Sequence, residues 1–275
     1  MFCPYHDNYR TPAGEIDKVT GAFFCFACQE SHTLIDFVMK VADKTYFQSI
    51  RIIEAGRGNT DILDEIANTL EPEPEFVEFD RSLIDRLHEQ AMDSDRAREY
   101  FESRKISLNS MAKYHLGYSA NQDMVTIPIM NPAGDMYVGF VGRGVAEKKF
   151  KNSTKLPRAK TMFNIQRAKR SHTVYVVESS FDAIRLEQMG VSAVALLGSS
   201  VNPRQGELLK KYFNSVVVIG DNDDAGQQMG QKILDKLGKS AIIVGIPKRF
   251  KDVGDMTNED ISQLIYRVDD PTISL

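Results

Sequence analysis

Acidic residues follow three apolar, β-branched runs in the C-terminal half of the chain, where each run would end as a strand. They are Glu178, Asp221, Asp223, Asp252 and Asp255. Carboxylates placed this close together repel one another unless a cation, a ligand or water compensates their charge. Hard oxygen ligands suit Mg²⁺ or Mn²⁺, which also bridge to the phosphates of a substrate. The pattern therefore predicts a divalent-metal site that acts on phosphates.

The surrounding sequence predicts how these acids are brought together. Apolar runs alternate with amphipathic stretches over residues 172–247, which is typical of a mainly parallel sheet with right-handed crossovers. The carboxyl ends of parallel strands meet at one edge of the sheet, where function gathers. Upstream, residues 81–113 carry apolar residues at helical spacing, and residues 125–144 read as two strands around a turn at 131–135.

A second cluster of candidate ligands lies at the N-terminus. All the cysteines fall within the first 28 residues, and with one histidine they give the pattern C-x2-H-x18-C-x2-C. Its members are Cys3, His6, Cys25 and Cys28. Two close pairs separated by a loop form a tetrahedral zinc site, whereas an odd number of clustered cysteines fits disulfides poorly. The alternative is three reduced core cysteines beside an unrelated histidine.

The predicted zinc is structural, because four protein ligands leave no coordination position open. We expect Gly14 to lie in the loop between the ligand pairs, and a strand to lead into the second pair. Ser31 or Thr33 is a candidate cap for the helix that follows.

Charge is distributed unevenly along the chain. The net charge is −4, yet residues 143–170 carry ten basic residues against one acid, Glu147. Polyphosphate or nucleic acid is the obvious counter-charge for such a stretch. The alternative is a solvated basic face without a ligand.

The predicted fold class is α/β, with four segments. They are a zinc-binding ribbon domain (1–55), a linker rich in proline and glutamate (56–79), a basic α+β subdomain (80–170) and a mainly parallel α/β subdomain (171–275). No apolar run is long enough to span a bilayer, and the N-terminus lacks the apolar core of a secretory signal. We therefore expect a cytoplasmic protein with no membrane partner.

These motifs resemble a known family. Glu178 at a strand end, followed by D-N-D-D-A-G at a later strand end, resembles the TOPRIM fold. CPYH…FFCFACQESHTLIDFVM is similar to the N-terminal CHC2-type zinc ribbon of bacterial and phage DnaG-type primases. REYFESRKISLNSMAKYHLGYS and VTIPIMNPAGDMYVGFVGRG…KFKNS resemble the polymerase domain of the same family. The resemblance covers nearly the whole chain, in the family's order.

The resemblance implies synthesis of RNA primers from NTPs on a single-stranded DNA template, by nucleotidyl transfer that depends on Mg²⁺ or Mn²⁺. It implies metal-binding or catalytic roles for acids at the strand ends and one helical turn later: Glu178, Asp182, Asp221, Asp223, Asp252 and, less directly, Asp255. It implies contacts to nucleotide and template for Arg104, Arg143, Lys149, Lys151 and Lys160. The zinc ribbon would help to choose the template start sequence.

Some residues depart from the family pattern. Ser179 follows the strand-end glutamate and Asn222 separates the two aspartates, where the family commonly has glycine. Asp224 matches no family ligand, so we expect it to be a helix N-cap or a first-turn charge. The chain ends soon after these motifs, so we expect the family's helicase-binding domain to be absent and a separate replicative helicase to be the partner.

Two other functions remain open at this point. A TOPRIM-type nuclease would use the same acids for cleavage, and a non-catalytic zinc-ribbon DNA-binding replication factor would use none of them. The complete set of Glu178, Asp221 and Asp223 argues against a degenerate, binding-only module.

Overall fold

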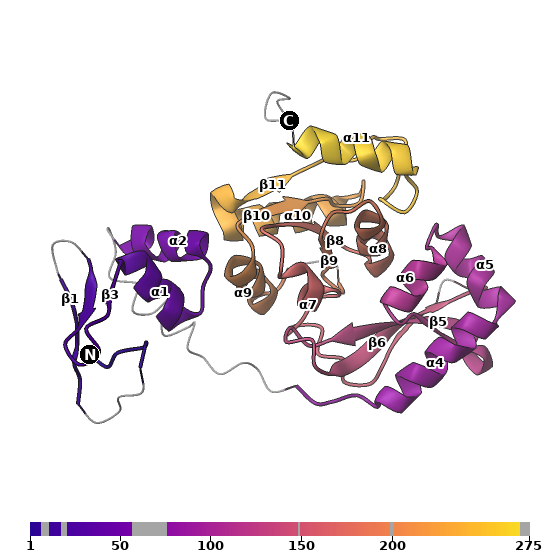
Figure 1. Cartoon of the computed structure of the whole chain (residues 1–275). Coiled ribbons are helices and arrows are strands. Elements are labelled where there is room, and N and C mark those ends of the chain that lie inside the picture. Colours follow the sequence, from indigo (N-terminus) through magenta and orange to yellow (C-terminus); the bar gives the residue numbers. More distant parts are fainter. Residues whose placement is uncertain (7–10, 18–20, 57–75, 148, 199–200, 270–275) are drawn as a thin grey trace. The chain divides into compact units, whose positions relative to one another are not determined.

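The computed structural model describes residues 1–6, 11–17, 21–56, 76–147, 149–198 and 201–269 (Figure 1). The chain divides into two compact units, Met1–Glu73 and Pro74–Leu275. Most of the linker predicted over 56–79 lies outside the described residues.

The first unit is a small antiparallel sheet followed by helices. The strands are β1 (Gly14–Ile16), β2 (Phe23–Cys25) and β3 (Ser31–His32), in the order β1-β2-β3, and the helices are α1 (Leu34–Ala42) and α2 (Tyr46–Gly56). Thr33 caps α1 as predicted, in a capping box with Asp36. Phe23 stacks on Phe37 with ring centroids 4.7 Å apart, which joins the sheet to α1.

The expectation that Gly14 lies in a loop is wrong, because this residue belongs to β1 and pairs with Cys25. A Cβ atom at this position would lie 2.6 Å from the ring of Phe23. A glycine is therefore needed here for the buried aromatic ring to pack against the strand, and not to form a turn.

The second unit begins with helices and an antiparallel sheet. The helices are α4 (Arg81–Asp93), α5 (Asp95–Ser103) and α6 (Leu108–Lys113). The strands are β4 (Gly117–Ser119), β5 (Met124–Met130), β6 (Tyr137–Gly144) and β7 (Phe150–Asn152), in the order β4-β5-β6-β7, with the short helix η1 (Ala120–Gln122) after β4. The predicted turn between β5 and β6 is closed by Asn131, whose Oδ1 accepts a hydrogen bond from Gly134 N at 2.9 Å.

A parallel sheet with helices on both faces completes this unit, as the alternating sequence pattern predicted (Figure 1). The strands are β8 (Thr173–Val177), β9 (Ala193–Ala195), β10 (Ser215–Val218) and β11 (Ala241–Ile243), in the order β11-β10-β8-β9. The helices are α7 (Ile165–Ala168), α8 (Ser180–Gln188), α9 (Pro203–Tyr212), α10 (Asp224–Leu237) and α11 (Asn258–Asp269), with η2 (Gly238–Ser240) before β11.

Side chains alternate between two cores across this sheet. Val174 and Val176 join the cluster that includes Leu208 of α9 and Ile233 of α10. Tyr175, Val177 and their neighbours on the other face join the larger cluster, which includes residues of α8, α11 and the antiparallel sheet. Both faces are covered, so the strands are buried and their carboxyl ends are held in fixed positions.

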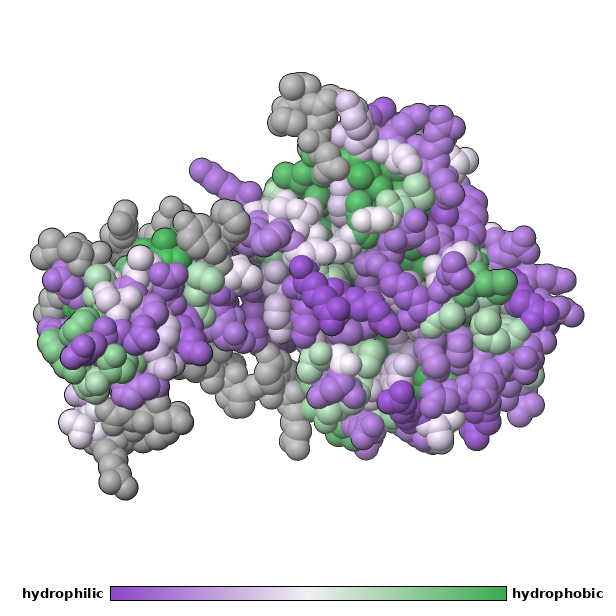
Figure 2. All heavy atoms as spheres, viewed as in Figure 1, coloured by the Kyte–Doolittle hydropathy of each residue, from purple (hydrophilic) through white to green (hydrophobic). Residues whose placement is uncertain are grey.

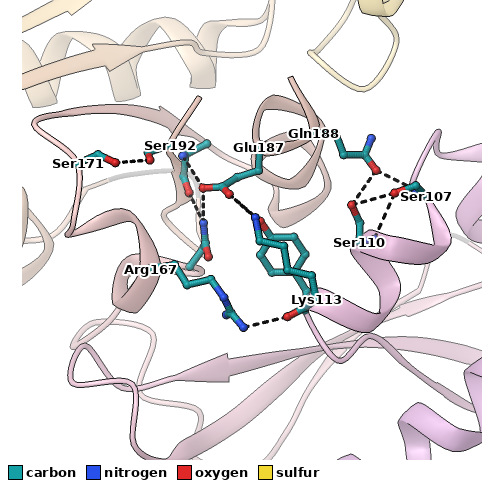
Figure 3. A network of polar contacts seen from close by, with 11 residues as sticks. Ser107, Ser110, Lys113, Arg167, Ser171, Glu187, Gln188 and Ser192 are labelled. Atoms are coloured by element: carbon teal, nitrogen blue, oxygen red, sulfur yellow. Dashed lines mark hydrogen bonds and ion pairs between the residues drawn. The ribbon is translucent and has the colours of Figure 1, made fainter. Parts of the chain in front are cut away.

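Polar contacts join α6 and its flanking residues to α8, which packs on the parallel sheet (Figure 3). Glu187 on α8 accepts hydrogen bonds from Lys113 Nζ at 2.8 Å and from the Tyr114 hydroxyl at 2.9 Å. Gln188 Oε1 accepts from the Ser107 backbone N–H at 2.8 Å and from the Ser110 hydroxyl at 2.9 Å. Because these contacts cross between separate elements, they hold α6 and its two capping residues against α8.

The visible surface of the second unit is mostly hydrophilic, with apolar residues confined to smaller patches (Figure 2). Among the described residues, none of the helices combines the length and apolar character that crossing a bilayer requires.

Candidate active site and zinc centre

The cysteine and histidine residues of the first unit converge on one point. The ligand atoms of Cys3, His6, Cys25 and Cys28 all lie within 4.8 Å of one another. Cys3 Sγ and Cys28 Sγ are 3.8 Å apart, and Cys25 Sγ lies 4.0 Å from His6 Nδ1. Zinc–sulfur bonds of about 2.3 Å at tetrahedral angles place two sulfur atoms about 3.8 Å apart. The donor set and its spacing therefore fit the predicted zinc ion.

Acids from three strand ends line one cavity of about 460 Å³ in the second unit. Glu178 directly follows β8, Asp221 follows β10, and Asp252 lies in the segment after β11. Asp182, in the first turn of α8, completes the group and is only 4% exposed. The parallel topology thus brings these four predicted residues together.

Two glycines let the first turn of α10 approach the end of β10. A Cβ at Gly220 would lie 2.5 Å from the carbonyl oxygen of Gly226, and a Cβ at Gly226 would lie 2.3 Å from that of Asp221. Real Cβ atoms do not come this close to a carbonyl oxygen. Only glycine at both positions allows the backbone approach that fixes Asp221.

Burial and mutual repulsion raise the pKa values of these acids. Burial is the main cause that raises the pKa of Asp221 to about 7, followed by the charges of Glu178, Asp252 and Asp223. The pKa of Glu178 is raised by burial and by Asp223, and that of Asp182 is raised well above its usual value by burial and by Asp252. The protonated forms are favoured because the negative charges lack compensation.

The Glu178 carboxylate fits a cation directly. Its Oε1 is buried and has no hydrogen-bond partner among the described residues. A buried carboxylate oxygen without a donor is unfavourable, and a divalent cation would satisfy it together with the neighbouring carboxylates. The donor set consists of oxygen ligands only, which suits Mg²⁺ or Mn²⁺.

The lining of this cavity is also basic. Its cationic lining residues are Arg104, Arg143, Arg158 and Lys251. The Arg143 guanidinium lies over two aromatic rings, 4.9 Å from the centroid of Phe150 and 5.9 Å from that of Phe181. A cavity lined by both carboxylates and guanidinium groups can hold a cation and a polyphosphate together.

Some predicted site residues lie outside the lining of this cavity. They are the acids Asp223 and Asp255 and the lysines Lys149, Lys151 and Lys160. Asp223 is the N-cap of α10, and its Oδ1 accepts from Gly226 N at 2.9 Å. Asp224 is in the first turn, which was one of the two positions predicted for it.

The remaining acid and the lysines have different surroundings. Asp255 Oδ2 accepts a hydrogen bond from the Lys251 backbone N–H at 3.1 Å, inside the segment that follows β11. Lys149, Lys151 and Lys160 are exposed, and Lys151 donates to Gln122 Oε1 at 3.0 Å.

Sequence reasoning missed two cationic residues of the cavity. Arg158 was counted in the basic stretch but not singled out, and Lys251 was passed over although it precedes Asp252. The charge of Lys251 partly offsets the raised pKa values of Glu178 and Asp221. Its position directly before a predicted ligand was the signal that could have identified it.

Known proteins share this architecture. Residues 1–67 match the CHC2 zinc finger family, and residues 175–257 match the Toprim-like family. A DNA primase of Clostridium acetobutylicum is 24% identical over 332 residues, which cover 99% of this chain and 54% of that relative.

Solved structures agree with these matches at the level of the fold. The crystal structure of the zinc-binding and RNA polymerase domains of the Aquifex aeolicus primase has a TM-score of 0.58 at 23% identity, covering 96% of this chain and 77% of that chain. A DnaG primase catalytic domain bound to single-stranded DNA has a TM-score of 0.56 at 21% identity, covering 68% of this chain and 77% of that chain.

The chain therefore combines a CHC2 zinc finger with a Toprim-like α/β domain. This is the combination found in DnaG-type primases, and the resemblance drawn from the sequence motifs is confirmed over nearly the whole chain. The predicted fold class is confirmed as well. The chain spans about half the length of the curated relatives it matches.

Removal of zinc should unfold the first unit and leave the second intact. A ribbon this small depends on its metal for folding, whereas residues 76–269 have large cores of their own. Hydrogen exchange with and without a strong chelator measures this on the whole chain. We expect β2 and α1 to lose protection while β8 and β10 keep theirs, and Cys25→Ser should act like the chelator. Unchanged protection in β2 would contradict a structural zinc site.

Binding of Mn²⁺ to the acidic cavity should weaken at low pH, because the ion must displace a proton from Asp221, whose pKa is about 7. One displaced proton makes the affinity about tenfold lower at pH 6 than at pH 8. Titration calorimetry at both pH values measures this, and Asp221→Asn should show a weaker and less pH-dependent affinity. Equal wild-type affinities at the two pH values would refute the assignment.

The stability of the metal-free protein should change in the opposite sense. The folded state holds the Asp221 proton more tightly than the unfolded state does, so this group's contribution to stability falls as the pH rises from about 4 to 7. Melting curves of chelator-treated protein measure it, and Asp221→Asn should flatten the dependence.

Proposed function

We propose that this chain is a DNA primase, a DNA-directed RNA polymerase that makes short RNA primers on single-stranded DNA during replication. The observation that carries the proposal is the cavity whose lining combines acids from three strand ends with three arginines and a lysine. Nucleotidyl transfer needs this arrangement, because it brings a negatively charged triphosphate to a site that must also accommodate cations. The DNA primase relatives agree with it.

The proposed reaction is attack of a primer or initiating-nucleotide 3′-hydroxyl on the α-phosphate of an NTP, with pyrophosphate leaving. A bound Mg²⁺ or Mn²⁺ would lower the pKa of the hydroxyl and neutralise developing charge. Glu178, Asp221 and Asp252 would hold the ion, since their carboxylates line the same cavity. Arg143 and Arg158 would orient the triphosphate through charge-assisted hydrogen bonds. No side chain has to act as a covalent nucleophile.

Asp182, Asp223 and Asp255 take supporting parts in this proposal. Asp182 is nearly fully buried and interacts with the charges of Asp252 and Asp221, so its ionised form would strengthen the negative potential at the ion. Asp223 adds its charge beside Glu178 while it caps α10. Asp255 fixes the backbone of Lys251 and, through its own N–H, the carboxylate of Asp252 at 3.0 Å.

The template would contact Arg104 in the cavity lining and exposed basic residues outside that lining. Lys149, Lys151 and Lys160 are exposed, and Arg104 lines the cavity next to the ring of Tyr100, with its guanidinium 5.6 Å from the ring centroid. Cations of this kind contact phosphates without reading sequence. A similar DnaG catalytic domain has been solved bound to single-stranded DNA. The zinc ribbon would add the choice of start sequence, and a separate replicative helicase would be the partner.

A primer-synthesis assay tests the proposal against both alternatives. The protein is incubated with single-stranded DNA, labelled NTPs and Mg²⁺ or Mn²⁺, and short RNA products are expected. Asp221→Ala should lower their yield at least about 100-fold, because the site loses a ligand of the ion that neutralises charge at the phosphate. Asp235→Ala, an exposed acid on α10 remote from the cavity lining, is the matched control and should retain wild-type yield.

The other outcomes identify the alternatives. Shortened DNA without RNA would replace the primase proposal with a TOPRIM-type nuclease. DNA binding without any reaction would leave a zinc-ribbon binding factor.

The zinc ribbon is expected to act in initiation more than in extension. Cys25→Ser should abolish initiation at a preferred template sequence while extension of a supplied primer stays within about threefold of wild type, because the cavity residues lie in the other unit. Both activities are measured on the same preparation. An equal loss of both would contradict this division of roles.

A further inference from the structure

Lys105 makes contacts that neither the zinc ribbon nor the cavity lining explains. Its Nζ donates hydrogen bonds to three consecutive backbone carbonyls: Gly254 O at 3.1 Å, Asp255 O at 2.9 Å and Met256 O at 3.0 Å. An ammonium group has three N–H donors, so all of them are used on one loop about 150 residues away in the sequence.

The backbone of Lys105 is held in an unfavourable conformation. Its φ angle is +58°, in the left-handed region that a lysine rarely adopts. The flanking residues explain why the chain turns here: Arg104 lines the cavity and Ile106 is buried in the larger core. The turn between them points Lys105 at the loop over 254–256.

This loop begins two residues after Asp252, the cavity's third strand-end acid, and bonds to it. Asp252 Oδ1 accepts a hydrogen bond from Asp255 N at 3.0 Å, and the Gly254 N–H donates to Asp182. A Cβ at Gly254 would lie 3.1 Å from both Asp182 Oδ1 and Asp252 Oδ1. A displacement of this backbone would therefore remove a hydrogen-bond donor from each of these two cavity acids.

The preceding part of the same segment is held by a different residue. Asn222 Nδ2 lies within hydrogen-bond distance of Ile246 O at 3.3 Å, Pro247 O at 3.2 Å and Phe250 O at 2.7 Å. Arg185 adds one bond, from its Nη2 to Met256 O at 3.1 Å. The segment after β11 is thus held in place by side chains of other elements, and Lys105 is the one that comes from the α5–α6 connection.

We infer that Lys105 is a positioning residue for the divalent-metal site: by holding the carbonyls of residues 254–256, it keeps Asp252 and Asp182 directed at the cavity. Lys105 itself is not among the residues that line the cavity. It also links the α5–α6 connection, which carries Arg104, to the loop that bonds to the acids. Arg104 and the acids are therefore fixed relative to each other. The inference rests on the metal site of the proposed function.

Binding of Mn²⁺ to variants, without NTP or DNA, tests the inference. Lys105→Met keeps most of the unbranched side chain but removes its donors and charge. We expect about tenfold weaker Mn²⁺ binding, since residues that orient metal ligands contribute on this scale. The sign is decisive. If Lys105 acted only through its charge, its removal would strengthen cation binding, and that result would overturn the inference.

A second variant separates positioning from general stability. Lys105→Gly relieves the left-handed backbone, so it should be at least as stable as Lys105→Met, yet it should bind Mn²⁺ just as weakly. Hydrogen exchange should rise at residues 253–256 in both variants. Wild-type Mn²⁺ affinity in Lys105→Gly would show that the weaker binding of Lys105→Met comes from its lower stability alone, and would overturn the inference.

Lys113→Met is the matched control. Lys113 also reaches from the helical segment to another element, through its bond to Glu187 on α8 (Figure 3), but it does not contact the loop after β11. We expect lower stability with Mn²⁺ affinity within about twofold of wild type. An equal loss of affinity in Lys113→Met would contradict a specific role for Lys105.

The experiment also distinguishes this inference from the proposed function. Wild-type protein that binds Mn²⁺, loses affinity on Lys105→Met and makes no RNA would refute the primase proposal alone. Primer synthesis with unchanged Mn²⁺ affinity in Lys105→Met would refute the positioning role alone.

Discussion

Repulsion among carboxylates at the ends of parallel strands is the constraint on which the rest of the second unit depends. Glu178, Asp182 and Asp221 are held partly or fully out of water, and their pKa values are raised because burial and like charges disfavour ionisation. Such a group is stable only when protons, cations or basic side chains compensate it. The protein supplies rigid backbone that positions the acids, and basic side chains in the lining of the same cavity.

The backbone that positions the acids is built from parts that are far apart in the sequence. Gly220 and Gly226 let α10 approach the end of β10, and the segment after β11 is held by Asn222, Arg185 and Lys105. Part of the basic lining comes from the antiparallel sheet, where Arg143 of β6 lies over aromatic rings. Packing of the two sheets into one core brings Arg143 and the strand-end acids into the lining of one cavity.

Most elements of the fold were predictable because their signals are local. The alternation of strands and helices over 172–247 follows from hydrophobic periodicity, and the parallel sheet follows from that alternation. Gly14 was misplaced because a strand glycine that faces an aromatic ring has the same sequence appearance as a loop glycine. Asp223 is also the N-cap of α10, in addition to its charge beside Glu178. This role depends on the extended backbone conformation of Asp223, which residue spacing does not reveal.

The sequence by itself determined the four zinc ligands and the acids at three strand ends, because ligand spacing and strand period are properties of short segments. Only the tertiary structure decided which acids line the cavity and which cations share that lining with them. It alone revealed Lys251 as a neighbour of the acids and Lys105 as the residue that holds their loop. Contacts of this kind join residues separated by up to about 150 positions, and no local pattern records them.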